Sequence, residues 1–84
     1  QEMDKDINLL IKIVSTSLKL NKNKINDKSS VKNLDEWDSI GHLSILMALD
    51  KHFKGKLQNI DELSECDSIK KIHMVLLKNQ IFKK

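Results

Sequence analysis

The apolar positions in the first quarter of the chain follow the period of an α-helix. From Asp4 to about Leu20 they recur on one face, at Ile7, Leu10, Ile11, Val14 and Leu18. Asp4 and Asp6 fall in the first turn and Lys19 in the last, which suits the helix dipole. The pattern predicts an amphipathic helix over residues 4–20.

Residues 21–38 have no such period. They are rich in Asn, Lys, Asp and Ser, with Ile25, Val31 and Leu34 as the only aliphatic anchors. We expect a long ordered loop, and an irregular connection of this length is often functional. Trp37 lies near its end and is expected to pin the loop onto the helices, because tryptophan is highly buried on average.

A second helical pattern starts at Ser39 or Ile40 and runs to Phe53. Its apolar residues cover more than half of the helical wheel, which predicts a central helix buried on several sides; they are Ile40, Leu43, Leu46, Met47, Leu49 and Phe53. The remaining strip is expected to be exposed and open to another protein; it consists of Gly41, Ser44, Ala48, Lys51 and His52. Gly55 is expected to end the helix in a left-handed conformation.

Residues 59–64 favour one or two further helical turns. These turns are expected to bury Ile60 and Leu63 and to expose Asp61 and Glu62.

A closing helix follows, capped by Asp67 or Ser68. Its apolar positions are Ile69, Ile72, Val75 and Leu76, and its basic end is Lys78, Lys83 and Lys84. The prediction is an all-α fold, a small four-helix bundle with three main helices and a short third helix, with a long loop between the first two. Residues 1–84 form a single domain, with 1–3 outside the folded unit and 81–84 frayed.

Composition and charge argue against some classes of protein and of partner. The chain of 84 residues has no proline and one cysteine, Cys66, so no internal disulfide is expected. No apolar run is long enough to span a membrane, and we expect a cytoplasmic monomer. The net charge of +3 is unevenly distributed, because residues 33–67 hold eight acids against three lysines while both ends are basic. This distribution argues against a nucleic-acid partner.

The candidate chemistry lies at Asp38-Ser39-Ile40, where the loop meets the second helix. A hydroxyl there is beside unpaired N–H groups at the positive end of the helix dipole, which favours an anion such as a covalently attached phosphate. The alternative is that Asp38 or Ser39 simply caps the helix. Asp67-Ser68-Ile69 repeats the pattern, and we interpret it as a second use of the same capping chemistry.

Over almost its whole length the chain resembles an acyl carrier protein. That family has a helix, a long loop, an Asp-Ser-Leu signature that opens a second helix, a short third helix and a closing helix. Here Asp38-Ser39-Ile40 stands at the signature, with Ile40 in place of leucine. Glu36-Trp37-Asp38-Ser39 followed by Gly41-His42-Leu43 is more similar to stand-alone carriers than to the main fatty-acid carrier.

The resemblance implies that Ser39 receives 4′-phosphopantetheine from coenzyme A, and that the thiol of this arm carries an acyl or aminoacyl group as a thioester. Such a protein is not an enzyme. Its implied partners are a phosphopantetheinyl transferase, a loading ligase and a downstream transferase or synthase. Asp38 would orient the transferase and its metal, and His42 is expected to be a surface residue near the prosthetic group.

The surface expected to recognise partners departs from the family pattern. It comprises Glu36, Gly41, Ser44, Met47, Ala48, Lys51, Asp61 and Glu62. Gly41 and Ser44 stand where the family usually has acids, and Lys51 and His52 replace acids further along. We therefore expect a dedicated pathway, such as surface-polysaccharide, secondary-metabolite or aminoacyl-group transfer.

Other kinds of site have weaker support. Asp38, Ser39 and His42 are residue types of a hydrolase triad, but one helix end can hardly supply a base, an orienting acid and an oxyanion hole. The spacing of His52, Cys66 and His73 matches no zinc motif. The alternatives that stay open are a basic nucleic-acid-binding domain, although the chain has fifteen lysines and no arginine, and a docking module whose serine is not modified.

Overall fold

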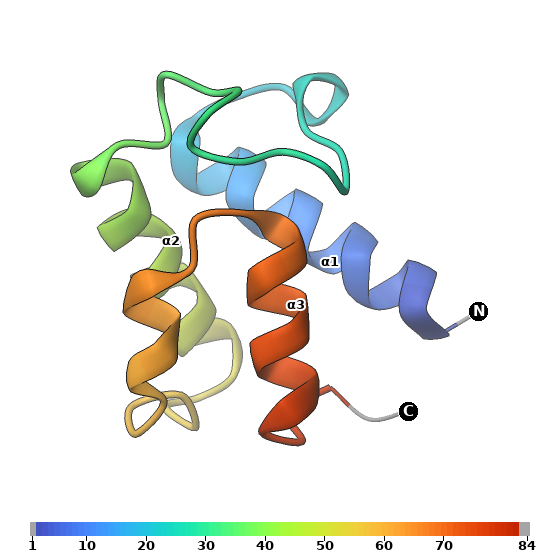
Figure 1. The fold of residues 1–84 in the computed structure, drawn as a ribbon, viewed down its shortest axis with the longest axis vertical. Helices are drawn as coiled ribbons and strands as arrows, with labels where there is room; N and C mark the ends of the chain where they lie inside the picture. Colours follow the sequence, from blue (N-terminus) through green and yellow to red (C-terminus); the bar gives the residue numbers. More distant parts are fainter. Residues whose placement is uncertain (1, 83–84) are drawn as a thin grey trace.

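Helix α1 is the element on which the two other α-helices pack. The structure is a computed structural model that describes residues 2–82; its elements are α1 (Glu2–Leu18), the 3₁₀ turn η1 (Lys22–Lys24), α2 (Ser39–His52), the 3₁₀ helix η2 (Asp61–Glu65) and α3 (Ile69–Lys78). Helix α1 packs against both α2 and α3, and η2 also lies beside α2 and α3 (Figure 1). The expectation that the second helix is the central one is wrong.

The element boundaries agree with the sequence pattern to within a few residues. Helix α1 ends at Leu18, because Lys19 adopts a left-handed conformation with φ of 59°. Gly55, with φ of 81°, follows the end of α2 as expected. Helix α1 begins at Glu2, so residues 2 and 3 belong to the helix and not to a segment outside the fold, while residue 1 lies outside the described residues.

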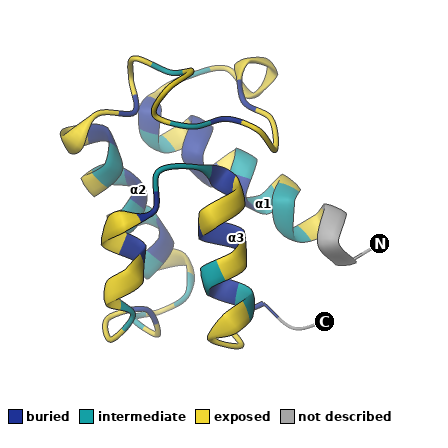
Figure 2. Ribbon diagram, in the orientation of Figure 1, coloured by how far each residue is buried: buried dark blue, intermediate teal, exposed yellow. Residues whose placement is uncertain are grey.

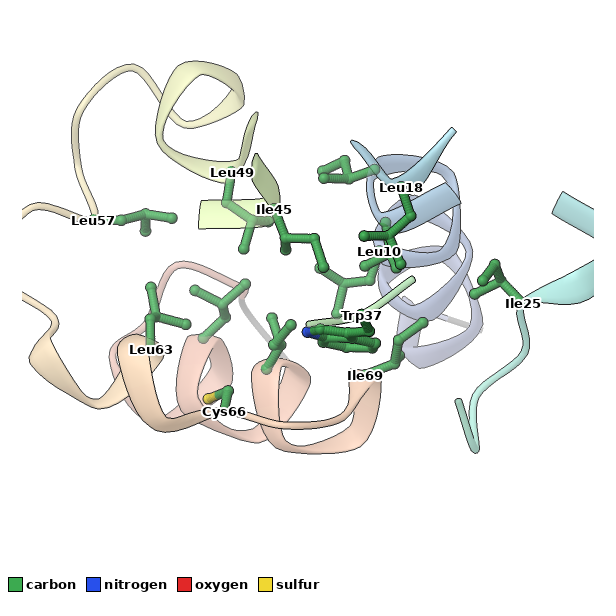
Figure 3. Close-up of a cluster of buried hydrophobic side chains, with 14 of the residues drawn as sticks. Leu10, Leu18, Ile25, Trp37, Ile45, Leu49, Leu57, Leu63, Cys66 and Ile69 are labelled. Atoms are coloured by element: carbon green, nitrogen blue, oxygen red, sulfur yellow. The ribbon is translucent and has the colours of Figure 1, made fainter. Parts of the chain in front are cut away.

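The core is aliphatic around a single indole. Side chains from all three helices are fully buried in it, namely Leu10, Val14, Ile45, Leu49, Ile69, Ile72 and Leu76. Each helix carries buried and exposed residues in turn along its length (Figure 2). Trp37 is 2% exposed and lies among the buried side chains (Figure 3), which confirms that it pins the loop. Ile25 also anchors the loop, but Val31 is 41% exposed and does not.

Helix α2 buries only part of the face that we predicted, because Leu49 is buried and Leu46 and Phe53 are half-buried, while the other three residues are exposed. Ile45 and Leu49 are buried, whereas Ile40, Leu43 and Met47 are 77%, 56% and 64% exposed. These three residues recur at i, i+3 and i+7 and form an apolar stripe that begins directly after Ser39. The helix is apolar around most of its circumference, so its periodicity could not decide which side faces α1.

The predicted exposed strip of α2 is therefore only partly exposed. Lys51 and His52 are exposed as expected, but Ser44 and Ala48 are half-buried and Gly41 is buried. A Cβ atom on Gly41 would meet the Leu18 side chain at 2.8 Å and would approach the Glu36 carbonyl oxygen even more closely. Gly41 is thus required for the close approach of α2 to the loop and α1, and it is buried where we predicted an exposed residue.

The end of the chain adds to the core. Phe82 is buried, and its ring meets Phe53 edge-on with centroids 5.7 Å apart. His73 of α3 is buried beside it, with Nε2 3.7 Å from a carboxylate oxygen of Asp6. Fraying was therefore wrongly predicted for residues 81 and 82, while residues 83 and 84 lie outside the described residues.

Replacing Gly41 by alanine tests the close approach at the start of α2. Alanine favours a helix over glycine by about 1 kcal/mol, but the added methyl group meets a backbone carbonyl that cannot move away easily. We expect Gly41→Ala to lower the free energy of unfolding by about 1–3 kcal/mol in urea denaturation. Ser44→Ala, on the same helix, is the control and is expected to change stability by no more than about 0.5 kcal/mol. A Gly41→Ala variant as stable as the wild type would contradict this packing.

Candidate functional site

Asp38 is the residue that caps α2. Its backbone is extended, and its Oδ1 accepts a hydrogen bond of 2.8 Å from the backbone N–H of Gly41. Its carbonyl oxygen accepts a second bond of 2.8 Å from the N–H of His42. Asp38 thus binds the N–H groups of Gly41 and His42 in the first turn, as an N-cap aspartate commonly does.

Ser39 is consequently left without a structural task. It is the first residue of α2, its side chain is exposed, and its hydroxyl makes no hydrogen bond to any described residue. Of the two residues that the sequence offered as a cap, the structure uses the aspartate. The serine hydroxyl therefore lies at the helix N-terminus, accessible to solvent and to another protein.

In the second Asp-Ser-Ile tripeptide the serine, and not the aspartate, caps the helix. Here Ser68 is the cap, because its Oγ accepts a 3.1 Å hydrogen bond from the N–H of Lys71. Asp67 instead forms a 3.1 Å ion pair with the Lys71 ammonium. Ser68 also pairs with Ser30 in an isolated β-bridge that joins α3 to the loop. The two tripeptides therefore share a sequence but not the same capping chemistry.

The side chains of Trp37 and His42 and the carbonyl group of Leu63 are connected by two hydrogen bonds close to Ser39. The indole Nε1–H of Trp37 donates to Nδ1 of His42 over 3.0 Å, and Nε2 of His42 lies 3.0 Å from the carbonyl oxygen of Leu63. The indole can only donate and the carbonyl can only accept. His42 must therefore be the tautomer that carries its hydrogen on Nε2 and leaves Nδ1 as the acceptor.

This arrangement corrects the expectation for His42. It is half-buried and bridges the loop to η2, whereas we predicted a surface residue. Both of its ring nitrogens are engaged, so neither is available as a base for the Ser39 hydroxyl. The triad that the residue types suggested is thus not assembled.

An open hollow lies between the start of α2 and the end of η2. It has a volume of about 490 Å³, and its lining includes Trp37, Asp38, Ser39 and His42 on one side and Ser64, Glu65, Cys66 and Asp67 on the other. Asp38 and Glu65 are exposed at this hollow. Its charged rim is therefore acidic, with Asp67 paired to Lys71.

The remaining residues predicted to recognise partners lie on two surfaces. Glu36, Met47 and Lys51 are exposed on the loop and α2, and Asp61 and Glu62 are exposed on η2, as expected. Glu62 is bound by Lys78, whose ammonium lies 2.9 Å from its carboxylate and holds the pKa of Glu62 below its ordinary value through a hydrogen bond and its charge. Asp61 therefore presents its charge more freely than Glu62 does.

Two other kinds of site are absent from the part of the chain that the structure describes. No three histidine, cysteine or acidic side chains among residues 5–82 come together to hold a metal ion. No helix within residues 2–82 is long and apolar enough to cross a membrane.

The different roles of Ser39 and Ser68 can be measured as stability. Ser39→Ala removes an exposed hydroxyl that makes no hydrogen bond to a described residue, and we expect the free energy of unfolding to change by no more than about 0.5 kcal/mol. Ser68→Ala removes a helix cap, and a loss of about 1 kcal/mol is expected. Urea denaturation followed by circular dichroism compares the two. Equal losses would mean that Ser39 also supports the fold.

The Cys66 thiol is expected to react slowly. It is 5% exposed, its Sγ lies 3.5 Å from the Glu62 carbonyl oxygen, and burial raises its pKa to about 11. At pH 8 only about one molecule in a thousand then carries the reactive thiolate, and the rate should rise as the pH approaches 11. We expect an aromatic disulfide reagent to react with the native protein at pH 8 at least about tenfold more slowly than with the same protein unfolded in guanidinium. Similar rates in both states would show that the thiol is accessible.

Comparisons with protein-family models, with curated proteins and with solved structures find no significant match to this chain. What this chain does must therefore be inferred from the site itself. Its main features are a free hydroxyl at a helix N-terminus, a neighbouring aspartate that has taken over the capping role, and a histidine whose ring nitrogens are both engaged.

Proposed function

We propose that this chain is a carrier protein of the acyl carrier type, with 4′-phosphopantetheine attached to Ser39. One observation carries the proposal. Ser39 stands at the signature position of the resemblance, and its hydroxyl is exposed and unused because Asp38 caps α2. A serine kept at a helix start with no role in the fold is well suited to modification by another enzyme.

The surroundings of Ser39 fit the phosphate of such an arm. The backbone N–H groups of Ser39 and Ile40 donate no hydrogen bond to any described residue, as expected for the first turn of a helix. They and the helix dipole favour a negative charge at this end of α2. The exposed carboxylates of Asp38 and Glu65 oppose a tightly held anion. Together these features favour an arm that is anchored here and extends into solvent.

The chain's own residues have limited roles in the attachment reaction. The Ser39 oxygen forms the new ester bond to phosphorus while adenosine 3′,5′-bisphosphate leaves coenzyme A, and the hydroxyl proton passes to a base. That base belongs to the transferase, because both ring nitrogens of His42 are engaged. Asp38 Oδ1 is held by Gly41, and the resemblance assigns this residue to orienting the transferase and its metal. The bound arm supplies a thiol that carries the cargo as a thioester.

The order of the helices also agrees with the proposal. With η2 taken as the short third helix, the order of α1, a long loop, α2, η2 and α3 corresponds to the four-helix bundle of a carrier. The hollow beside Ser39 would then be bordered by the second and third helices. This interpretation rests on the element order and on the position of Ser39.

The apolar stripe of α2 is the proposed contact surface for partner enzymes. Ile40, Leu43 and Met47 are 77%, 56% and 64% exposed, and contiguous exposed apolar side chains commonly mark interaction sites. Acids lie at the Ser39 end of the stripe, on Glu36 and Asp38, and Lys51 lies at its other end.

Partners would include the transferase, a loading ligase and a downstream transferase or synthase. The lysine at the far end of the stripe supports a dedicated pathway over general fatty-acid synthesis. Equal turnover of this carrier and a housekeeping carrier by a fatty-acid ketosynthase would contradict that choice.

Incubation with coenzyme A and a broad-specificity phosphopantetheinyl transferase tests the proposal. We expect the intact mass to rise by one phosphopantetheine and the gain to disappear in Ser39→Ala. Ser68→Ala is the matched control, because it alters the second Asp-Ser-Ile tripeptide and should be modified like the wild type. The modified protein should also acquire a fast-reacting thiol, which is distinguishable from the buried Cys66.

The opposite result is equally specific. A folded wild-type protein that gains no mass, and that binds DNA with an affinity that falls steeply with salt, would overturn the carrier proposal in favour of a basic nucleic-acid-binding domain.

A further inference from the structure

His42 joins two parts of the molecule that border the proposed attachment site. Trp37 lies two residues before Ser39, and His42 lies almost one helical turn after it. The imidazole accepts from the indole of Trp37 on one side and reaches the Leu63 carbonyl oxygen of η2 on the other, with both distances 3.0 Å. A single side chain therefore connects the loop, the first turn of α2 and η2.

The backbone at the start of α2 is held by other bonds. The backbone N–H groups of Gly41 and His42 donate to Asp38, so these bonds do not depend on the side chain at position 42. The link to Leu63 is different. It is a direct polar bond between α2 and η2, and it exists only because the imidazole carries its hydrogen on Nε2.

The position of η2 affects the surface around Ser39. Ser64 and Glu65 follow Leu63 and line the hollow that Ser39 and Asp38 border from the other side. The exposed carboxylate of Asp61 also lies on η2. A protein that docks over Ser39 meets α2 and η2 together, so the relative position of the two elements determines how well it can bind.

We infer that His42 is a positioning residue for the attachment site, holding η2 against the start of α2 so that partner enzymes meet one fixed surface around Ser39. The inference rests on the proposed function, since it concerns recognition of the same serine. It predicts an effect on binding of the carrier by the transferase, and not on reaction at the hydroxyl.

Three substitutions separate the two bonds of His42. Asparagine places an acceptor near the position of Nδ1 and can keep the bond to Trp37, but it is too short to reach Leu63. Glutamine places a donor near Nε2 and can restore the bond to Leu63. Phenylalanine keeps the ring and makes neither bond. Lys70→Phe is the control, because Lys70 is exposed on α3, lies outside the hollow and outside the proposed partner surface, and receives the same aromatic side chain.

The first measurement is the kinetics of modification at saturating coenzyme A, at a temperature where circular dichroism shows each variant folded. We expect His42→Phe and His42→Asn to raise the KM for the carrier about fivefold to tenfold, which corresponds to one hydrogen bond, with kcat within about twofold of the wild type. His42→Gln should bring KM most of the way back to the wild-type value, and Lys70→Phe should leave both constants unchanged. A role in stability alone would not produce this split in folded protein.

The second measurement uses the only tryptophan of the chain, whose indole N–H gives one NMR signal. In the wild type this hydrogen should exchange slowly and Nδ1 of His42 should be unprotonated. We expect exchange to be at least about tenfold faster in His42→Phe but not in His42→Asn. If His42→Phe does not fold, the asparagine and glutamine variants decide the result.

The outcomes separate this inference from the function on which it rests. A wild-type protein that is not modified overturns the proposed function and the role of His42 with it. Normal modification of the wild type, together with an unchanged KM in folded His42→Asn, overturns the inference alone. The same conclusion follows if kcat falls while KM stays constant, or if His42→Gln recovers no more than His42→Asn.

Discussion

An indole that enters an aliphatic core brings one N–H group that needs an acceptor. Trp37 is 2% exposed among leucine and isoleucine side chains, and leaving its N–H without a partner there would cost about 1–3 kcal/mol. Nδ1 of His42, on the adjoining helix, is the acceptor, and Nε2 of the same ring donates to the carbonyl oxygen of Leu63 in η2. The burial of one ring therefore determines the course of the long loop, the direction in which α2 leaves it and the position of the 3₁₀ helix that follows.

Around Ser39, the residues that stabilise the fold are different from the residue proposed to be modified. Asp38 satisfies the helix start, Gly41 allows the close approach to α1 and the Glu36 carbonyl, and His42 ties the neighbouring elements together. Ser39 and Ile40, which lie between these residues, are exposed. Because the fold is maintained by the flanking residues, the serine hydroxyl remains available. At Ser68 the hydroxyl is itself the cap and is not available in this way.

The apolar stripe of α2 has a cost for a chain of this size. Burying a large aliphatic side chain contributes about 1.5–3 kcal/mol, and a domain of 84 residues has few to spare. Ile40, Leu43 and Met47 nevertheless remain largely exposed. The core is completed by residues outside the three main helices, including Trp37, Leu57, Leu63 and Phe82. This distribution leaves one side of α2 free for the contacts proposed above.

The sequence by itself determined where the helices lie, because local effects decide it. Apolar periodicity located α1 and α3, the tripeptides at Ser39 and Ser68 located the helix starts, and Gly55 marked the end of α2. Tertiary structure decided which face of α2 is buried, since a helix that is apolar around most of its circumference has no preferred side until α1 and the loop pack against Gly41 and Ile45. It also decided that Asp38 is the cap and that His42 is a bridge, because both roles depend on partners that meet only when the loop and η2 fold against α2.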